Sequence, residues 1–230
     1  MDVNEFVQQE YVKYKYFMDA DWMPEITISE NANCNAYMSV YPYEIYNKQY
    51  ILHTKILPNL KNEETRKNYC SLLFHEFTHI YDVLCVLNQN KNISYDDLYV
   101  RIINYTESHA TYVELMKQCG FSKYTDHRIL SEDTIVTIHN FTGSLNEIIK
   151  KEYITAQDIS NENILTYRKY LIEIKYFWGV LWFYNQYVAE YIIDYSVFKK
   201  SLRDTYRCWY SSIKTFNLEI IADLYDKIKL

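Results

Sequence analysis

The chain has 230 residues, of which 49% are apolar and 23% charged, the composition of an ordinary globular protein that can bury a large core. Its net charge is −6 and it contains no basic run, which excludes the class of proteins that bind nucleic acid through the phosphate backbone. Gly and Pro number only three each, so hairpin turns should be few and helices should dominate.

The N-terminal residues and the longest uncharged run predict a cytoplasmic protein without a membrane span. Residues 1–11 are acidic and lack the apolar core of a signal peptide. The longest uncharged run, 176–189, has 14 residues, whereas about 20 are needed to cross a bilayer. The five cysteines are odd in number and include no CxxC pair, which indicates reduced thiols.

The N-terminal part of the chain predicts one helix followed by a small sheet. Residues 3–18 have the spacing of an amphipathic helix, and Pro24 disfavours helical geometry at the residue before it. Residues 25–57 are rich in Ile, Tyr, Thr and Val with partial alternation, which predicts about three strands. A loop is expected at 57–62.

Two long helices follow, and both carry capping signals. The first is expected to begin at Asn62, a good N-cap residue, and to run to about Asn88. After a polar loop, the second begins at Ser94, and Asp97 stands at the capping-box position. Gly120 is a natural residue to follow its C-terminus.

The rest of the chain is predicted to be almost entirely helical. Residues 121–142 indicate a loop with a short helix, a further helix begins near 143, and two or three long helices occupy 161–230. The aromatic side chains at 167–187 recur at helical spacing, which favours core packing over a partner-binding surface. Because the strands precede most of the helices, the predicted fold class is α+β and mostly α.

The segment HEFTH at 75–79 contains the pattern HExxH. His75 and His79 are four residues apart, so on a helix they share one face and both imidazoles can reach one zinc ion at about 2.0–2.1 Å. Glu76 projects beside this pair, where its carboxylate can take a proton from a water that the metal activates. The apolar residues around the motif predict that the other side of the helix is buried.

A catalytic zinc ion also needs a third protein ligand. Asp82 follows His79 by three residues, but on an unbroken helix it lies about 10 Å along the axis from His75, and no helix breaker intervenes. The metzincin pattern requires Gly and His where this chain has Asp82 and Cys85, so that interpretation fails.

Glu107 is better placed if the two long helices form an antiparallel hairpin. The midpoint of the histidine pair lies 11 residues before Asn88, and Glu107 lies 13 residues after Ser94. The axial mismatch is therefore about 2 residues, or roughly 3 Å. This spacing predicts that Glu107 lies beside the histidines.

These residues resemble the gluzincin metallopeptidases, whose pattern is HExxH on one helix and a zinc-binding glutamate on a following helix. The resemblance covers roughly residues 25–120. It implies a zincin-like core, in which a small N-terminal sheet lies over the active-site helix and the glutamate helix. It also implies one zinc ion per chain bound by His75, His79 and Glu107, with Glu76 as the general base.

One position departs from the family pattern. Many gluzincins have an aspartate four residues after the third ligand, where it orients the first histidine, but this chain has Thr111 there. A backbone carbonyl could orient His75 instead. We expect a zincin-like metallopeptidase core over 1–142 and a helical C-terminal subdomain packed on it over 143–230. Small cytosolic gluzincins are common in phages and mobile elements, a setting compatible with this chain.

The implied activity is hydrolysis of a peptide or protein substrate. Glu76 would take a proton from the attacking water and pass it to the leaving amine. The segment 48–57 is expected to be an edge strand that docks an extended substrate through main-chain hydrogen bonds. Five residues are open candidates for the donor that stabilises the oxyanion: Tyr105, His109, Tyr112, His127 and His139.

Two other functions compete with the peptidase. In the first, the chain is a catalytically silent gluzincin-like module that binds or regulates a partner through the helices of 143–230. In the second, it is a helical structural protein with a chance HExxH. The intact Glu76 favours the peptidase, because a structural metal site has no need of a base. The substrate, endo- or exopeptidase action and the oligomeric state are left open.

Overall fold

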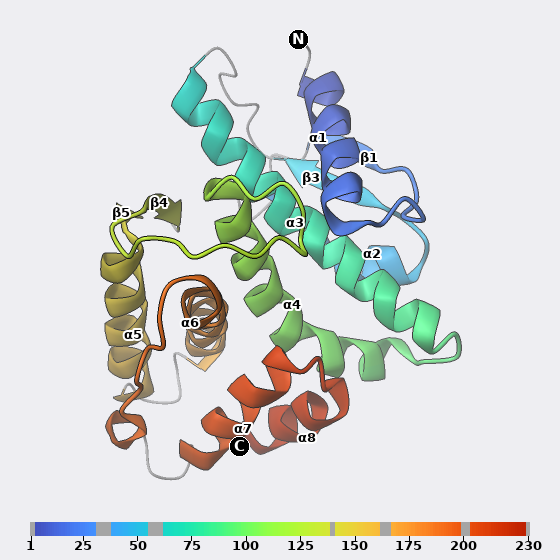
Figure 1. Ribbon diagram of the computed structural model, residues 1–230. Helices are drawn as coiled ribbons and strands as arrows, with labels where there is room; N and C mark the ends of the chain where they lie inside the picture. The colour runs from blue at the N-terminus through green and yellow to red at the C-terminus, as the bar shows by residue number, and fades with distance from the viewer. Residues whose placement is uncertain are drawn as a thin grey trace. The chain divides into compact units, whose positions relative to one another are not determined.

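The computed structural model describes residues 3–30, 38–54, 62–138, 141–161, 167–198 and 203–228, and Figure 1 shows its helices and strands. The helices are α1 (Val3–Met18), α2 (Pro42–Tyr46), α3 (Glu63–Gln89), α4 (Tyr95–Gln118), α5 (Leu145–Asn161), α6 (Tyr167–Tyr187), the 3₁₀ turn η2 (Tyr195–Val197), α7 (Arg203–Lys214) and α8 (Leu218–Ile228). The strands are β1 (Thr27–Glu30), β2 (Met38–Ser39), β3 (Ile51–Thr54), β4 (Ile135–Ile138) and β5 (Phe141–Ser144). The predicted class, α+β and mostly α, is confirmed.

The chain divides into two compact units. Unit 1 consists of Met1–Leu98 with Val113–Asp126, and unit 2 consists of Tyr99–Tyr112 with His127–Leu230. Both ends of α4 therefore belong to unit 1 and its middle to unit 2. The domain boundary expected after residue 142 stays a prediction.

In unit 1, α1 packs along α3 (Figure 1), and aromatic side chains from both helices meet there. The ring of Tyr14 lies edge-on to Phe74 at 5.2 Å and to Phe77 at 5.5 Å between ring centroids. Its hydroxyl donates to Thr78 Oγ1 over 3.2 Å. All four side chains are buried, so the predicted burial of the other side of this helix is confirmed.

The sheet of unit 1 corrects the prediction of a docking edge at 48–57. The strand order is β1-β3-β2, with β1 parallel and β2 antiparallel to β3. His53 and Thr54 of β3 have partners on both sides, so their main-chain groups are not available to a substrate. The prediction was wrong because alternation within one strand carries no information on its place in the sheet. The outer strands among those described are β1 and β2.

Among the described residues, three strands lie within 25–57 as predicted, but a short helix that was not predicted stands between β2 and β3. Residues 42–46 form the short helix α2, and Pro42 stands in its first turn. Proline suits this place because its φ is already close to the helical value. A backbone N–H in the first turn has no acceptor within the helix, so the missing N–H of proline costs no hydrogen bond. The loop expected at 57–62 lies almost wholly outside the described residues.

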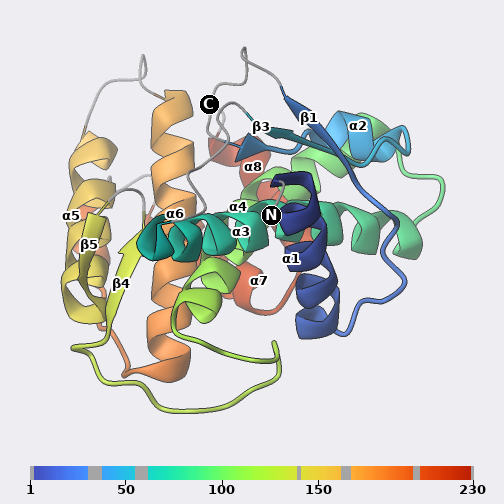
Figure 2. The same ribbon diagram turned by 90° about the horizontal axis from the view of Figure 1, so that it is seen from above.

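In unit 2, α5 and α6 run side by side (Figure 2), and α7 pairs with α8 (Figure 1). A hairpin of β4 and β5 replaces the short helix predicted within 121–142, with Ile135 paired to Ser144 and Ile138 to Phe141. The prediction was wrong because four successive residues, Ile-Val-Thr-Ile, are β-branched, and such residues prefer a pleated sheet.

The aromatic side chains at 167–187 lie on α6. Those that the structure describes pack in the core, as predicted. Phe177, Trp178, Leu181 and Phe183 are all fully buried. Trp178 lies 4.9 Å from Phe177 and 5.3 Å from Tyr210 of α7, measured between ring centroids. These side chains therefore stabilise unit 2 and offer no exposed aromatic surface at these positions.

Gly179 allows α6 to approach α4 closely, and its replacement by Ala is expected to destabilise the protein. A Cβ atom at this position would lie 2.4 Å from the Ser108 carbonyl oxygen and 2.7 Å from Thr111 Cβ. The clash with backbone should cost about 1–3 kcal/mol, more than the roughly 1 kcal/mol that Ala gains over Gly in a helix. Urea unfolding of Gly179→Ala measures the loss.

Gly143→Ala is the matched control. Its new methyl group would meet Phe141 Cε1 at 2.9 Å, an atom of a side chain that can rotate away. A smaller loss of unfolding free energy is expected. An equal loss of unfolding free energy in both variants would show that Gly179 is not required for the close approach of α6 to α4.

One segment among the described helices, Thr65–Gln89, is long and apolar enough to cross a membrane by length and composition alone. Its mean hydropathy is 1.2, and 67% of the window is buried within the protein. A buried core helix passes the same test, so this segment is weak support for a membrane span.

Candidate metal centre

The HExxH motif lies in the middle of α3, a helix with a well-defined start. The side chain of Asn62 accepts a hydrogen bond from the Thr65 backbone N–H over 2.8 Å, which confirms the predicted N-cap. The rings of His75 and His79 are 4.9 Å apart between centroids. Both side chains are buried, and they lie on one face of the helix as the four-residue spacing requires.

Glu107 is the third member of this group. It lies on α4, whose predicted cap is confirmed, since Ser94 Oγ accepts from the Asp97 backbone N–H over 3.1 Å. One ligand atom each from His75, His79 and Glu107 all lie within 4.8 Å of one another. Three atoms bound tetrahedrally at about 2.1 Å from one ion are roughly 3.4 Å apart. The group could therefore hold a metal ion after small side-chain movements.

Glu114 orients His75, a role that the sequence prediction did not give it. His75 Nδ1 lies 3.0 Å from Glu114 Oε2, and both side chains are buried. A carboxylate only accepts, so Nδ1 carries the proton and Nε2 keeps its lone pair for a metal ion. His75 thus has a carboxylate partner, whereas the sequence suggested only that a backbone carbonyl could take this role.

A sequence signal for this pairing existed. Glu114 follows Glu107 by seven residues, which is two helical turns, so both carboxylates lie on the same face of α4. Thr111, where the family pattern has an aspartate, instead donates from its hydroxyl to the Glu107 carbonyl oxygen over 2.8 Å.

Glu76 differs from its neighbours on α3 in its exposure. It is partly exposed, whereas His75 and Phe77 on either side are buried. Its side chain therefore retains some access to solvent. This is the placement expected of a group that exchanges protons with a water or a substrate.

Asp82 and Cys85, which stand at the metzincin positions, do not join the metal-binding group among the described residues. Asp82 is buried at 1% exposure. Burial, and secondly the Asp82 carboxylate, raises the pKa of Cys85 to about 11. Cys85 is therefore a neutral thiol at pH 7.

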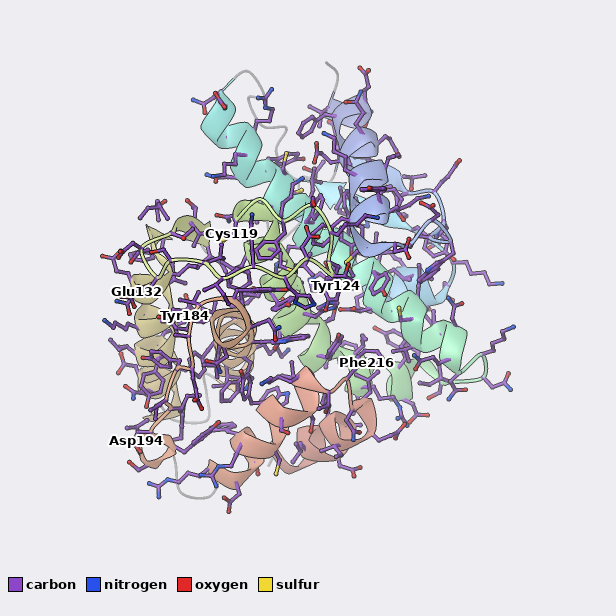
Figure 3. The ribbon with its side chains drawn as sticks, in the orientation of Figure 1. Cys119, Tyr124, Glu132, Tyr184, Asp194 and Phe216 are labelled. Atoms are coloured by element: carbon purple, nitrogen blue, oxygen red, sulfur yellow. The ribbon has the colours of Figure 1, made fainter. Side chains whose placement is uncertain are left out.

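The structure shows the surroundings of four of the five candidates for the oxyanion donor. Tyr112 shares a 2.7 Å hydrogen bond with the Tyr187 hydroxyl. Tyr105 is buried with its ring 4.8 Å from Phe216, which is labelled in Figure 3. His109 is also buried and stacks on Trp182 at 5.7 Å between centroids.

The other two candidates are His127 and His139. His127 is exposed, and His139 lies outside the described residues. The assignment of the donor among the five thus stays open.

Comparison of the chain with protein-family models, with curated proteins and with solved structures finds no match. The resemblance to gluzincins therefore depends on the residues of the motif and on their arrangement.

Proposed function

We propose that this protein is a zinc-dependent metallopeptidase of the gluzincin type. The observation that supports the proposal is the assembly of His75, His79 and Glu107, whose ligand atoms lie within 4.8 Å of one another. The buried Glu114 on His75 strengthens it, because metal-binding histidines are commonly oriented by a carboxylate. The zincin-like arrangement of sheet and helices belongs to the same proposal.

The donor set fits a zinc ion. Two imidazole nitrogens and one carboxylate oxygen are the ligands of catalytic zinc sites that keep a fourth position open. Sites for Mg²⁺ or Ca²⁺ are built from oxygen atoms, so two histidines disfavour both. When bound, the ion would polarise the scissile carbonyl and lower the pKa of a water molecule toward 7.

The chain's own residues divide the remaining work. His75, His79 and Glu107 hold the ion, and Glu114 keeps the His75 ring in the orientation that binding needs. Glu76 accepts the proton of the attacking water and delivers it to the amine that leaves. An extended peptide would dock along one of the outer strands, β1 or β2, through main-chain hydrogen bonds.

The metal content of the purified protein tests this proposal. We expect about one zinc per chain in the wild type. Glu107→Ala should bind zinc at least about 100-fold more weakly, because even residues that only orient a ligand contribute 10–100-fold. Elemental analysis after dialysis, followed by a peptide-library cleavage screen, gives both readouts.

Asp96→Ala is the control, since it removes an exposed carboxylate from the same helix. It should keep its zinc. Equal zinc in the wild type and Glu107→Ala would reject Glu107 and bring Asp82 back into consideration. A wild type that takes up no zinc would reject the peptidase and favour a binding module.

A further inference from the structure

Unit 1 contains a cavity that the proposed reaction does not use. Its volume is about 450 Å³, within the range of roughly 300–1,000 Å³ that is typical of small-molecule sites. The lining comes from α1, α3, α4 and the segment that follows α4, all within unit 1. No lining residue belongs to the metal-binding group, so the cavity is a separate candidate site.

Aromatic rings form much of its wall. Phe17 of α1 lies edge-on to Phe74 of α3, with 5.4 Å between ring centroids. The Tyr124 backbone N–H donates to the Phe17 carbonyl oxygen over 2.9 Å, which holds the segment after α4, with the buried ring of Phe121, against α1. Tyr16 completes the wall and is 64% exposed, so the cavity opens to solvent there. Such a wall suits an apolar ligand.

Two lysines line the same cavity and share one buried carboxylate. Glu10 is 3% exposed, and its Oε1 pairs with Lys13 over 2.5 Å while its Oε2 pairs with Lys117 over 3.4 Å. The Lys117 ammonium group also lies 4.1 Å from the centroid of the Phe74 ring, which keeps it at the apolar wall. Two ammonium groups against one carboxylate leave one positive charge in surplus.

A third lysine and a second carboxylate nearby compensate each other. The Lys123 ammonium group lies 3.5 Å from the centroid of the Tyr16 ring. Asp126 accepts hydrogen bonds from the Ser122 hydroxyl and from the backbone N–H groups of Ser122 and Lys123. The surplus of one positive charge therefore remains, in a chain whose net charge is −6. It is complementary to a ligand that carries one negative charge.

We propose that this cavity binds a medium-chain fatty acid. The aliphatic chain packs against the aromatic wall, and the carboxylate pairs with the ammonium groups of Lys13 and Lys117, which are donors for charge-assisted hydrogen bonds. A phosphate monoester carries about 1.5 to 2 negative charges at neutral pH, more than the single surplus charge. A cationic amphiphile would be repelled by the same two lysines.

The first test compares two ligands that differ only in the sign of the head group. Dodecanoate and dodecylamine are titrated into the wild-type protein by calorimetry, below their micelle-forming concentrations. Dodecanoate should bind with a Kd below about 1 mM, and dodecylamine at least about tenfold more weakly. Absence of dodecanoate binding, or equal affinity for the two ligands, would overturn the proposal.

The second test locates the ligand with variants of the lining. Lys117→Met keeps the apolar stem but loses the charge, so dodecanoate should bind about tenfold more weakly. Val12→Asp puts a negative charge on the wall at a position that is 63% exposed, so it should fold normally and bind at least about tenfold more weakly. Lys91→Met, at an exposed loop position outside the cavity, should bind as the wild type does. Wild-type affinity in both cavity variants would place the ligand elsewhere and overturn the proposal.

A peptide partner is the other occupant that this chemistry could admit. An acetylated peptide of alternating Phe and Glu offers the same apolar and anionic groups, and it should bind more weakly than dodecanoate. Tighter binding of the peptide, lost in Val12→Asp, would overturn the fatty acid and assign the cavity to a protein partner. None of these measurements needs zinc, so their outcome is independent of the proposed peptidase activity.

Discussion

Replacing Glu76 by Gln should reduce peptidase activity by about 10²–10⁴-fold while leaving zinc in place. A positioned general base contributes rate enhancement of this size, and Gln has the same shape but cannot take a proton. Glu76 is partly exposed beside His75 and does not belong to the group that could hold the metal. The measurement is kcat/KM on a cleaved peptide, together with zinc content.

Glu63→Gln is the matched control, since it makes the same change at an exposed position in the first turn of the same helix. It should keep wild-type activity. Full activity in Glu76→Gln would remove this residue from the mechanism. Loss of zinc together with activity would mean that Glu76 holds the metal instead of moving a proton.

Replacing Glu114 by Ala should weaken zinc binding by about 10–100-fold, the usual cost of removing a residue that orients a metal-binding histidine. The Nδ1 proton of His75 loses its acceptor at 3.0 Å inside the protein, so the free energy of unfolding should also fall by about 1–3 kcal/mol. Chelator competition and urea unfolding measure the two effects.

Glu114→Gln separates charge from hydrogen bonding. Its amide oxygen still accepts from His75, so it should recover most of the stability but only part of the zinc affinity. Asp96→Asn changes an exposed carboxylate of the same helix and should be neutral. Wild-type zinc affinity in Glu114→Ala would show that the hydrogen bond between Glu114 and His75 does not affect metal binding.

The sequence was most informative where the determining interactions are local. Asn62 and Ser94 start their helices through bonds to residues three further on, and such caps are visible in any short window. The side-by-side placement of His75 and His79 follows from helical geometry alone. The position of Glu107 was predicted from its spacing along two long helices joined by a short loop, and its ligand atom lies within 4.8 Å of those of His75 and His79.

Long-range pairings could not be predicted in this way. The central place of β3 depends on β1 and β2 bonding to its two sides, and no pattern within 48–57 shows how many neighbours a strand has. The helix α2 and the hairpin of β4 and β5 were missed because their segments are short. In short segments the intrinsic preference of the residues is no stronger than the influence of tertiary contacts on secondary structure.

The sequence by itself determined the fold class, the long helices and the three residues that could hold a metal ion. Tertiary structure alone decided that the Glu114 carboxylate lies 3.0 Å from His75 Nδ1. The physical reason is that this is a contact between side chains on different helices, 39 residues apart in the chain. Such contacts depend on how helices pack and rotate about their axes, which spacing within one helix does not specify.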